Sequence, residues 1–436
     1  MAASTDASQL EWTTLSRSVV ADKVRGLLVG AALGDAIGLA TEFLPRSEVL
    51  RIYGTDTPLF AFGTDASHPD AIPFHTDYHR AKWRTGDFTD DTDQHLLILL
   101  SFLRNKGRGI DPNDFASRLH SWIQQGLRCL DKMPCGIGRT TGNIVTDSNY
   151  QSDPIGTARA YWERTGRNVA PNGAVMRTAI IGALLAPQGL ESVQKTTEAV
   201  ASTTHADPRC ILSCVIITSL VYEILKGTSI TPAFMRSTIE TLADKYLQPP
   251  DTDPSKIPSP KSELLQFCFP DSIQSLELDD RMGIGYTYRS LGSATWSLTQ
   301  LLSTTLSPSH SPAKTFKSLI TTLTTQGGDA DTNATVAGAL LGCQIGYSSL
   351  PSEWLFGLIH KDILLAKVDA ALELMGVLEG EYDAEGDRDT LLDGGRGFLS
   401  KDEMERREME MMGRMAGLME RKAKEGSKKE EGCAVM

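Results

Sequence analysis

Residues 86–95 read GDFTDDTDQH, and the apolar run LLILLSFL follows at once at residues 96–103. In this run the apolar residues recur at the three- and four-residue spacings of a helix, and they cover nearly every face of it. The stretch therefore predicts a buried helix that begins among Thr89, Asp90, Asp91 and Asp93. Several carboxylates at the mouth of a buried helix repel one another unless something neutralises them.

The composition is that of a globular protein with a large core. The chain has 436 residues, of which 41% are hydrophobic and 22% charged, and its net charge is −12. The acidic balance argues against nucleic-acid binding through a general basic surface. Seven cysteines at irregular spacings, with no C-x-x-C pair, favour a reducing, cytoplasmic compartment. The first residues have no signal-peptide pattern, and no run approaches the ~18 apolar residues of a membrane span.

Helical periodicity dominates the chain and strand-like alternation is scarce, so the sequence predicts an all-α fold. The predicted helical segments are 20–43, 93–104, 174–186, 207–226, 290–302, 314–323, 331–346 and 361–378. Residues 54–86 form a polar insertion, and the Pro-rich residues 247–262 are expected to form a surface loop.

The pattern divides the chain into four parts. We expect an N-terminal tail at 1–19, one large domain at 20–379, a linker rich in Gly and Asp at 380–399, and a charged, Met-rich helix with its tail at 400–436. Ser400 and Glu403 make a capping-box pattern at the start of that last helix. Its methionines fall roughly on one face, which is typical of a core or partner contact.

A second acidic cluster lies far along the chain in QGGDADTNATVAGALLG, residues 326–342. Asp329, Asp331 and Thr332 again precede a helix of small apolar residues. Helix capping explains either cluster alone, because Ser, Thr and Asp suit N-caps and acids suit the positive end of the helix dipole. Two such clusters on buried helices exceed what capping needs, and hard oxygen ligands favour Mg²⁺ or Mn²⁺.

An ordered set of motifs resembles the ADP-ribosylglycohydrolase family, which includes the dinitrogenase-reductase-activating glycohydrolases. The long insertion is similar to that of the fungal branch of the family. The motifs are GLLVGAALGDAIGLATEF (26–43), FTDDTDQ (88–94), GIGRTT (136–141), NGAVMRTA (172–179), THADPR (204–209), GYTYRSLGSATWSL (285–298) and GGDADTNATVAGALLG (327–342).

This resemblance implies a compact, orthogonal multi-helix domain with a binuclear Mg²⁺ or Mn²⁺ centre. It also implies hydrolysis of the glycosidic bond at C1″ of ADP-ribose in an ADP-ribosylated protein or a related conjugate. Glu42, at the end of the first helix, or Asp331 would act as general base. Asp35 is expected to be structural, and the role of Asp93 is open. The implied metal ligands are Thr89, Asp90, Asp91, Asp329, Asp331 and Thr332.

The remaining motifs are expected to hold the substrate. Glycine N–H groups and threonine hydroxyls suit a pyrophosphate or ribose, and a helix start suits an anion. The expected substrate-binding residues are Gly136, Gly138, Thr140, Thr141, Asn172, Gly173, Arg177 and His205. Three histidines of the insertion, His68, His75 and His79, have no metal-ligand spacing and are interpreted as loop residues.

One position departs from the family pattern. Arg139 stands in a loop where arginine-specific bacterial relatives carry an aspartate, which disfavours removal of ADP-ribose from arginine. Serine-linked, O-acetyl and nucleotide-like substrates stay open. Two further alternatives are a catalytically silent ADP-ribose-binding or structural module, and a metal-dependent phosphohydrolase that uses the same acids.

The last four residues, CAVM, match a farnesylation box at Cys433. A single prenyl chain gives reversible membrane binding. We therefore expect a cytoplasmic protein that associates reversibly with membranes through this cysteine.

Overall fold

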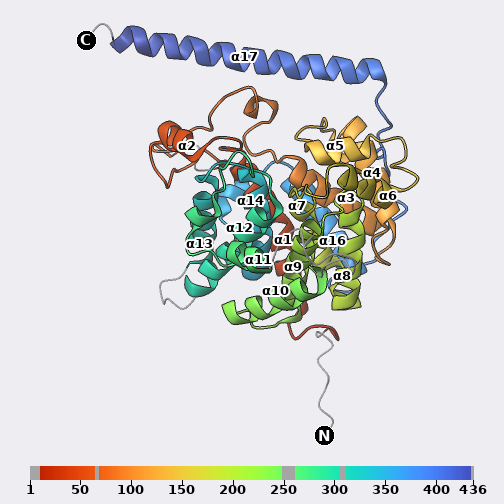
Figure 1. Ribbon diagram of the computed structural model, residues 1–436. Coiled ribbons are helices and arrows are strands. Elements are labelled where there is room, and N and C mark those ends of the chain that lie inside the picture. The colour runs from red at the N-terminus through yellow and green to blue at the C-terminus, as the bar shows by residue number, and fades with distance from the viewer. Residues whose placement is uncertain (1–9, 64–67, 248–260, 305–310, 434–436) are drawn as a thin grey trace.

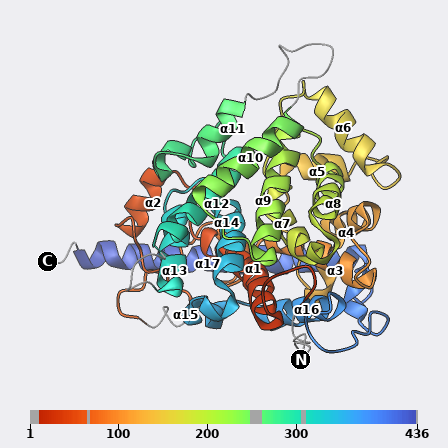
Figure 2. The same ribbon diagram turned by 90° about the horizontal axis from the view of Figure 1, so that it is seen from below.

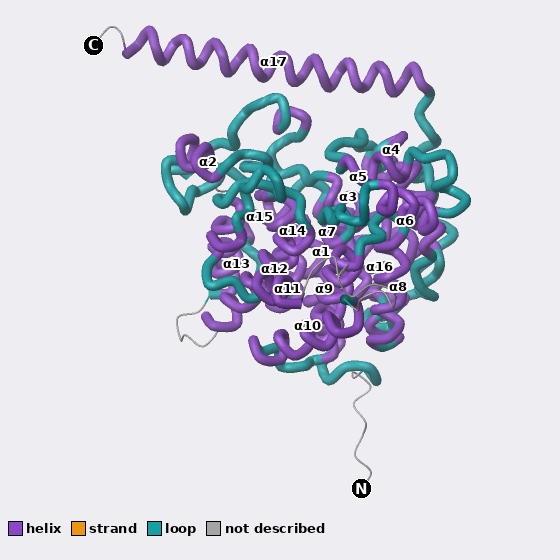
Figure 3. The backbone as a smooth tube through the Cα atoms, viewed as in Figure 1, coloured by secondary structure: helices purple, strands orange, loops and turns teal. Residues whose placement is uncertain are grey.

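The computed structural model describes residues 10–63, 68–247, 261–304 and 311–433, and the side chains of its last helix as far as Lys424. Within these residues the chain forms helices and loops but no β-strand, and only isolated β-bridges such as Pro171–Tyr286 occur (Figures 1 and 3). The prediction of an all-α fold is confirmed.

The α-helices are α1 (Arg17–Gly38), α2 (Arg46–Tyr53), α3 (Asp90–Arg104), α4 (Pro112–Gln125), α5 (Arg139–Val145), α6 (Pro154–Arg164), α7 (Val175–Leu184), α8 (Leu190–Ser202), α9 (Pro208–Lys226), α10 (Pro232–Tyr246), α11 (Lys261–Cys268), α12 (Thr287–Thr304), α13 (Pro312–Thr324), α14 (Ala330–Ile345), α15 (Ser352–Gly357), α16 (Lys361–Leu374) and α17 (Lys401–Cys433). The 3-10 helices are η2 (Arg80–Lys82), η3 (Arg128–Leu130), η4 (Ala186–Gln188), η6 (Ile273–Leu276), η7 (Tyr347–Ser349) and η8 (Arg388–Thr390).

Helices α1 and α14 pack against each other at unusually short range near the centre of the fold (Figures 1 and 2). Glycines line the contact: a methyl group at Gly30 or Gly34 of α1 would collide with the backbone of α14, and one at Gly338 of α14 would collide with α1. The glycines therefore allow backbone to lie on backbone, although glycine weakens a helix interior. The contact extends to Gly38, the last residue of α1, which lies against the start of α14.

This packing decides where the acidic residues lie. The C-terminal end of α1 meets the N-terminal end of α14, so the turn after α1 lies beside Asp329 and Asp331. The start of α3 is fixed to α1 by Asp35, whose carboxylate accepts hydrogen bonds from the backbone N–H groups of Thr89 and Thr92 at 2.9 and 3.0 Å. Three helix ends thus converge on one point.

Helix α9 is long and apolar enough to cross a membrane, with 19 residues and a mean hydropathy of 1.6 in its most apolar window. The sequence predicted a helix at 207–226 but no run of membrane-spanning length. In the fold 83% of that window is buried, and α9 packs against α7, α8, α10 and α12. The burial is that of a core helix.

The sequence predicted residues 380–399 to be a linker between the large domain and the last helix. In the structure this segment packs on the domain. Lys367 Nζ lies 2.7 Å from Asp387 and 2.8 Å from Asp389. Arg118 donates to the carbonyl of Thr390, which is fully buried. The N-terminal boundary also differs from the prediction, because Thr13 already bonds the carbonyl of Leu225 at 2.6 Å. Composition rich in Gly and Asp marked a turn-rich segment, not a detached one.

Helix α17 runs across the outside of the fold, on the side of the polar insertion (Figure 1). Its N-cap is Ser400, whose hydroxyl accepts from the Glu403 N–H at 3.2 Å. The methionine face is only partly used, since Met411 lies 3.9 Å from Cys135 through sulfur while Met412 is 62% exposed. The predicted lipidation site lies outside this description: residues 434–436 and the side chain of Cys433 are not described.

Candidate metal and substrate site

The two acidic clusters of the sequence meet in the structure. Carboxylate oxygens of Glu42, Asp329 and Asp331 lie within 4.8 Å of one another. The hydroxyl of Thr89 joins the clusters, because it lies 3.4 Å from an oxygen of Asp91 and 3.4 Å from an oxygen of Asp331. Segments about 240 residues apart in sequence therefore share one site, as the resemblance implied.

The electrostatics of this acidic centre call for a cation. Burial, and then the neighbouring carboxylates, raise the pKa values of Asp90, Asp91 and Asp331 well above the ordinary range. In the part of the chain that the structure describes, no lysine or arginine forms an ion pair with these residues or with Asp329. Asp91 Oδ1 is buried without any hydrogen-bond partner. Clustered carboxylate and hydroxyl oxygens with spare lone pairs fit a hard divalent cation.

Glu42 lies in the turn after α1, since the helix ends at Gly38 and not beyond Glu42 as predicted. Its neighbour Phe43 has a positive φ of 60°, a left-handed conformation that is rare outside glycine and costly for an aromatic residue. Hydrogen bonds hold this turn to the segment before α14: Phe43 N–H donates to Gly328 at 2.6 Å, and Gly328 N–H donates to Leu44 at 2.9 Å. The strained turn thus keeps Glu42 against the second cluster.

His79 of the insertion contacts this carboxylate, which the sequence did not predict. Its Nε2 lies 2.6 Å from Glu42 Oε2, and Glu42 is only 6% exposed. The two residues are 37 positions apart in an irregular segment, so no periodicity could place them together. His79 is a loop residue, as expected, but it belongs to the site.

Asp35 and Asp93, the two aspartates near the centre that are not among the implied ligands, each make contacts that hold the fold together. Asp35 caps the start of α3, and burial raises its pKa to about 6 even though Thr92 donates to it through both N–H and hydroxyl. Asp93, whose role was open, points away from the centre. It accepts from Trp122 Nε1 at 3.0 Å and lies 2.7 Å from Lys132 Nζ, so it ties α3 to the loop before Gly136.

A pocket of about 370 Å³ opens over the acidic centre, within the size range of ligand sites. Its lining joins Glu42 and the aspartates to seven of the eight residues that sequence reasoning assigned to the substrate, and to Arg139. Those seven are Gly136, Gly138, Thr140, Thr141, Asn172, Gly173 and His205.

Three of these lining residues are adapted to the site in particular ways. Gly136 has a positive φ of 87°, and any side chain there would overlap the carboxylate of Asp90. Asn172 donates to Asp329 at 2.9 Å, which links the substrate wall to the acids. Burial lowers the pKa of His205 well below its usual value, and its buried Nε2 has no partner while Nδ1 lies 2.7 Å from the Thr204 hydroxyl. Nε2 is therefore a polar atom open to a ligand.

Arg177 is not among the lining residues, contrary to its predicted position. It is fully buried beneath the pocket, where its guanidinium donates to Gln94, to the Gly173 carbonyl and to Thr204 at 2.7, 2.9 and 2.6 Å. The motif was located correctly, but the residue lies one turn into α7 and points into the core. It supports the pocket floor from below.

The profile of the ADP-ribosylglycohydrolase family matches residues 16–384, which span the pocket and all of its helices. The chain belongs to the ADP-ribosylglycohydrolase family. One relative is the ADP-ribosylarginine hydrolase Tri1 of Serratia proteamaculans, which is 25% identical to this family member over 78% of this chain and 76% of the relative. The ADP-ribosyl-[dinitrogen reductase] glycohydrolase of Rhodospirillum rubrum is 24% identical over 82% and 98%. The ADP-ribosylhydrolase ARH3 of Bos taurus is 26% identical over 76% and 87%.

A solved structure titled an ADP-ribosylglycohydrolase-related protein complex has the same fold. It aligns with a TM-score of 0.52 at 22% identity, over 82% of this chain and 99% of that one. Helix α17 lies beyond the residues that the family profile matches, so this family member carries an addition to the common domain.

Proposed function

We propose that this chain hydrolyses the glycosidic bond at C1″ of ADP-ribose in an ADP-ribosylated protein or a related ADP-ribose conjugate. The observation that carries the proposal is the meeting of the two acidic clusters at the base of one pocket with Gly136, Asn172 and His205. The family to which the chain belongs supports the same reaction.

The site would hold two divalent cations, Mg²⁺ or Mn²⁺, through the carboxylates of both clusters. The proposed ligands are Thr89, Asp90, Asp91, Asp329, Asp331 and Thr332, with hydroxyl groups beside the acids as hard donors. When bound, such ions polarise a ribose oxygen and lower the pKa of a bound water. The protein's part is to keep the carboxylates buried and close together, and the cations would stabilise their ionised form.

Glu42 is the favoured general base. It lies outside the six proposed ligands, and His79 Nε2 lies 2.6 Å from its Oε2, so it can accept a proton while the other carboxylates remain ligands. Asp331 is the alternative base, although the Thr332 N–H at 2.9 Å and the Thr89 hydroxyl already occupy it. Either base would activate a water that attacks C1″ as the leaving group departs through an oxocarbenium-like transition state.

The opposite wall of the pocket would hold the nucleotide. Gly136, Gly138, Thr140 and Thr141 line the space, and their N–H groups and hydroxyls are the groups that would bind a pyrophosphate. His205 offers Nε2 of a neutral imidazole to a ribose hydroxyl. Asn172 lies between this wall and Asp329, so it can align the ribose with the acids.

We expect linkages other than arginine to be preferred. Arg139 lies on the pocket wall and is exposed, so its guanidinium would repel the guanidinium of an arginine substrate. Serine-linked and O-acetyl conjugates carry no such charge. A silent binding module is disfavoured because both acidic clusters are complete. A metal-dependent phosphohydrolase that uses the same acids is the alternative that the products of the reaction distinguish.

The direct test is release of free ADP-ribose from serine-linked and arginine-linked substrates with Mg²⁺, Mn²⁺ or EDTA. Release from the serine-linked substrate that EDTA abolishes is the expected result. Tight ADP-ribose binding without release would support the silent module, and release of AMP or phosphate instead would support the phosphohydrolase.

We further propose a cytoplasmic protein that contacts membranes reversibly through a farnesylated Cys433, as the C-terminal CAVM pattern suggests. The test compares the membrane-bound fraction of the natural chain and of Cys433→Ser in cells. An equal fraction for both would remove this proposal without touching the hydrolase assignment.

A further inference from the structure

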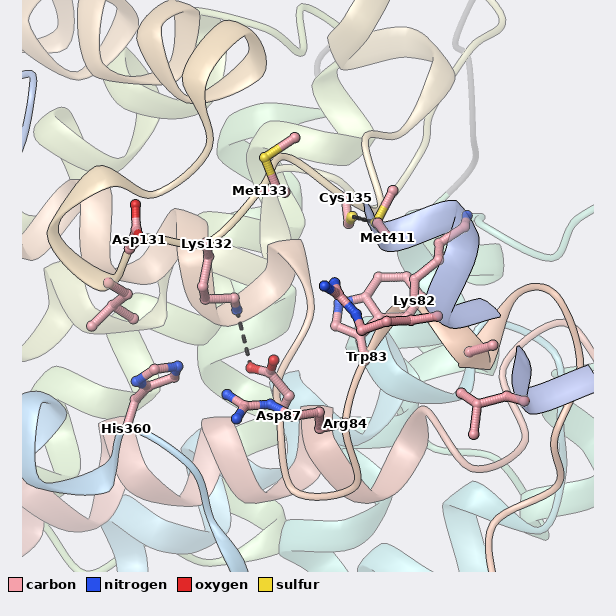
Figure 4. Close-up of a pocket in the computed structure, with 14 residues that line it drawn as sticks. Lys82, Trp83, Arg84, Asp87, Asp131, Lys132, Met133, Cys135, His360 and Met411 are labelled. Atoms are coloured by element: carbon pink, nitrogen blue, oxygen red, sulfur yellow. Dashed lines mark hydrogen bonds and ion pairs between the residues drawn. The ribbon is translucent and has the colours of Figure 1, made fainter. Parts of the chain in front are cut away.

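A second pocket, of about 470 Å³, lies between α17 and the body of the domain (Figure 4). One wall comes from the insertion around η2, a second from the loop before Gly136, and a third from α17 through Met411, Arg414 and Leu418. It is large enough for several side chains, within the usual range of ligand pockets. The proposed hydrolase reaction does not account for it.

This second pocket, here called the α17 pocket, adjoins the pocket over the acidic centre, here called the catalytic pocket, on two sides. Cys135 lines the α17 pocket, and the next residue, Gly136, lines the catalytic one. On the other side a row of rings connects them: Phe43 of the catalytic pocket lies 5.0 Å from His79, and His79 lies 5.3 Å from Trp83 of the α17 pocket. His79 also holds the carboxylate of Glu42. The α17 pocket therefore begins beside Glu42, the proposed general base, and beside Gly136 at the start of the proposed nucleotide wall.

The charges of the α17 pocket are of two kinds. Lys132, Asp87 and Asp131 are neutralised by ion pairs: Lys132 Nζ lies 3.4 Å from Asp87 and 2.7 Å from Asp93, and Asp131 pairs with two arginines outside the pocket. Figure 4 shows the Lys132–Asp87 contact at the back of the space.

Three other cations remain uncompensated. Within the described residues no carboxylate forms an ion pair with Lys82, Arg84 or Arg414. Lys82 lies over the ring of Trp83, with Nζ 5.6 Å from the ring centroid. A chain with a net charge of −12 thus presents, in the lining of one pocket, three positive side chains without an ion-pair partner among the described residues, and one of them lies over the ring of Trp83.

The apolar part of the lining narrows the class of ligand. The lining contains Met133, Met411 and Leu418 as well as the cations, and Trp83 adds an aromatic ring. A phosphate chain would gain little from thioethers and aliphatic groups, whereas a peptide with mixed apolar and acidic side chains would use both. Unpaired arginine and lysine groups suit carboxylates on such a peptide.

We propose that the α17 pocket binds an acidic segment of the substrate protein, next to its ADP-ribosylated residue. The inference rests on the proposed function, since it takes the modified residue to lie at the acidic centre while the acidic segment beside it lies in the α17 pocket. In this arrangement α17 forms the outer wall of a protein-binding subsite, and the enzyme prefers modification sites that have glutamate or aspartate neighbours.

The test uses the full-length protein and two peptides that carry the same ADP-ribosylated residue, in the linkage that the protein cleaves. One has glutamates on both sides of that residue, and the other has glutamines. We expect a KM about tenfold lower for the glutamate peptide at low ionic strength, because three partly exposed ion pairs together supply about that factor. The advantage should shrink at high salt.

The decisive variant is the triple change Lys82→Gln, Arg84→Gln, Arg414→Gln. The matched control, Lys401→Gln, Arg406→Gln, Arg421→Gln, removes the same charge from exposed positions of α17 that do not line the pocket. The peptide preference should vanish in the first variant and persist in the control, with kcat for the glutamine peptide unchanged in both. Equal KM values for the two peptides, or a preference that survives the first variant, would overturn the proposal.

A binding measurement separates failure of this inference from failure of the hydrolase reaction. Fluorescence polarisation of a labelled, unmodified glutamate peptide needs no turnover, so it tests the pocket even if neither peptide is cleaved. Binding that the pocket variant weakens and the control does not is the expected result. No binding of this peptide, together with binding of inorganic tripolyphosphate that the pocket variant weakens, would replace the peptide by a phosphate chain and refute the proposal.

Discussion

Replacing Gly136 by alanine should disable the acidic centre while leaving the fold intact. The added methyl group would lie 3.1 Å from Asp90 Cγ and would overlap the nearer carboxylate oxygen. To restore normal contact, the loop and the carboxylate must separate by about 1 Å, since carbon and oxygen pack at roughly 3.2–3.5 Å. The backbone angle of +87° adds strain, because residues with a Cβ adopt it rarely.

A displacement of that size matters because metal ligands must lie within about 0.2 Å of their ideal distance. We expect kcat/KM for ADP-ribose release to fall about 100-fold, because a 1 Å misplacement of reacting groups costs about that factor. The half-saturating metal concentration should rise as well. Circular dichroism should show unchanged helix content, because Gly136 is exposed and outside any helix.

Gly138→Ala is the matched control for this change. Gly138 lines the same pocket two residues further on, but nothing lies within 4 Å of a methyl group there and its φ of −62° suits any residue. Its half-saturating metal concentration should stay within about twofold of that of the natural chain, as a substitution in open space without backbone strain leaves Asp90 in place. If Gly136→Ala were as active as Gly138→Ala, the assignment of Asp90 as a ligand held against this loop would be wrong.

Three further predictions follow from the same geometry. His79→Ala should lower kcat/KM about tenfold, as expected for loss of a charge-assisted hydrogen bond to Glu42, and His79→Gln should recover part of that loss. Steady-state kinetics can check this, and unchanged kcat/KM in His79→Ala would leave His79 outside the mechanism. Gly30→Ala should destabilise the fold by about 1–3 kcal/mol through overpacking against α14, whereas Gly413→Ala on exposed α17 should not, which denaturant titration can check. The raised pKa values of Asp90 and its neighbours mean that the folded, metal-free chain binds protons more tightly than the unfolded chain. The destabilising effect of these carboxyl groups is therefore absent below about pH 3.9 and grows as the pH rises. Protons also compete with the cation for the same oxygens, so calorimetry should show that metal affinity falls as the pH is lowered.

The sequence predicted that the two acidic clusters belong together, and the structure brings them together. A carboxylate at a helix start lies at the end of a rigid element, so Asp90 and Asp331 could be assigned together once the ordered motifs fixed the family. The glycines that bring α1 onto α14 were visible in the sequence as well, but their meaning depends on the partner helix, which periodicity does not reveal.

The sequence was less informative about residues whose position depends on the direction of a side chain or on the packing of an irregular segment. Arg177 was assigned to the substrate because its motif opens a helix, and only the register of α7 shows that it points into the core. His79 lies in an insertion without periodic structure, so its contact with Glu42 depends on tertiary packing. Residues 380–399 have the composition of a linker, and their packing rests on a few pairs such as Lys367–Asp387.

The most direct test of the central claim is release of ADP-ribose by the natural chain and by the double variant Asp90→Asn, Asp331→Asn, with and without EDTA. These residues come from the two clusters, and both line the pocket. We expect release that needs a divalent cation, and a loss of at least about 1,000-fold in the folded double variant, as for removal of groups that stabilise transition-state charge. Release that persists in EDTA or in the double variant would contradict the proposal that the two clusters form one metal-dependent centre.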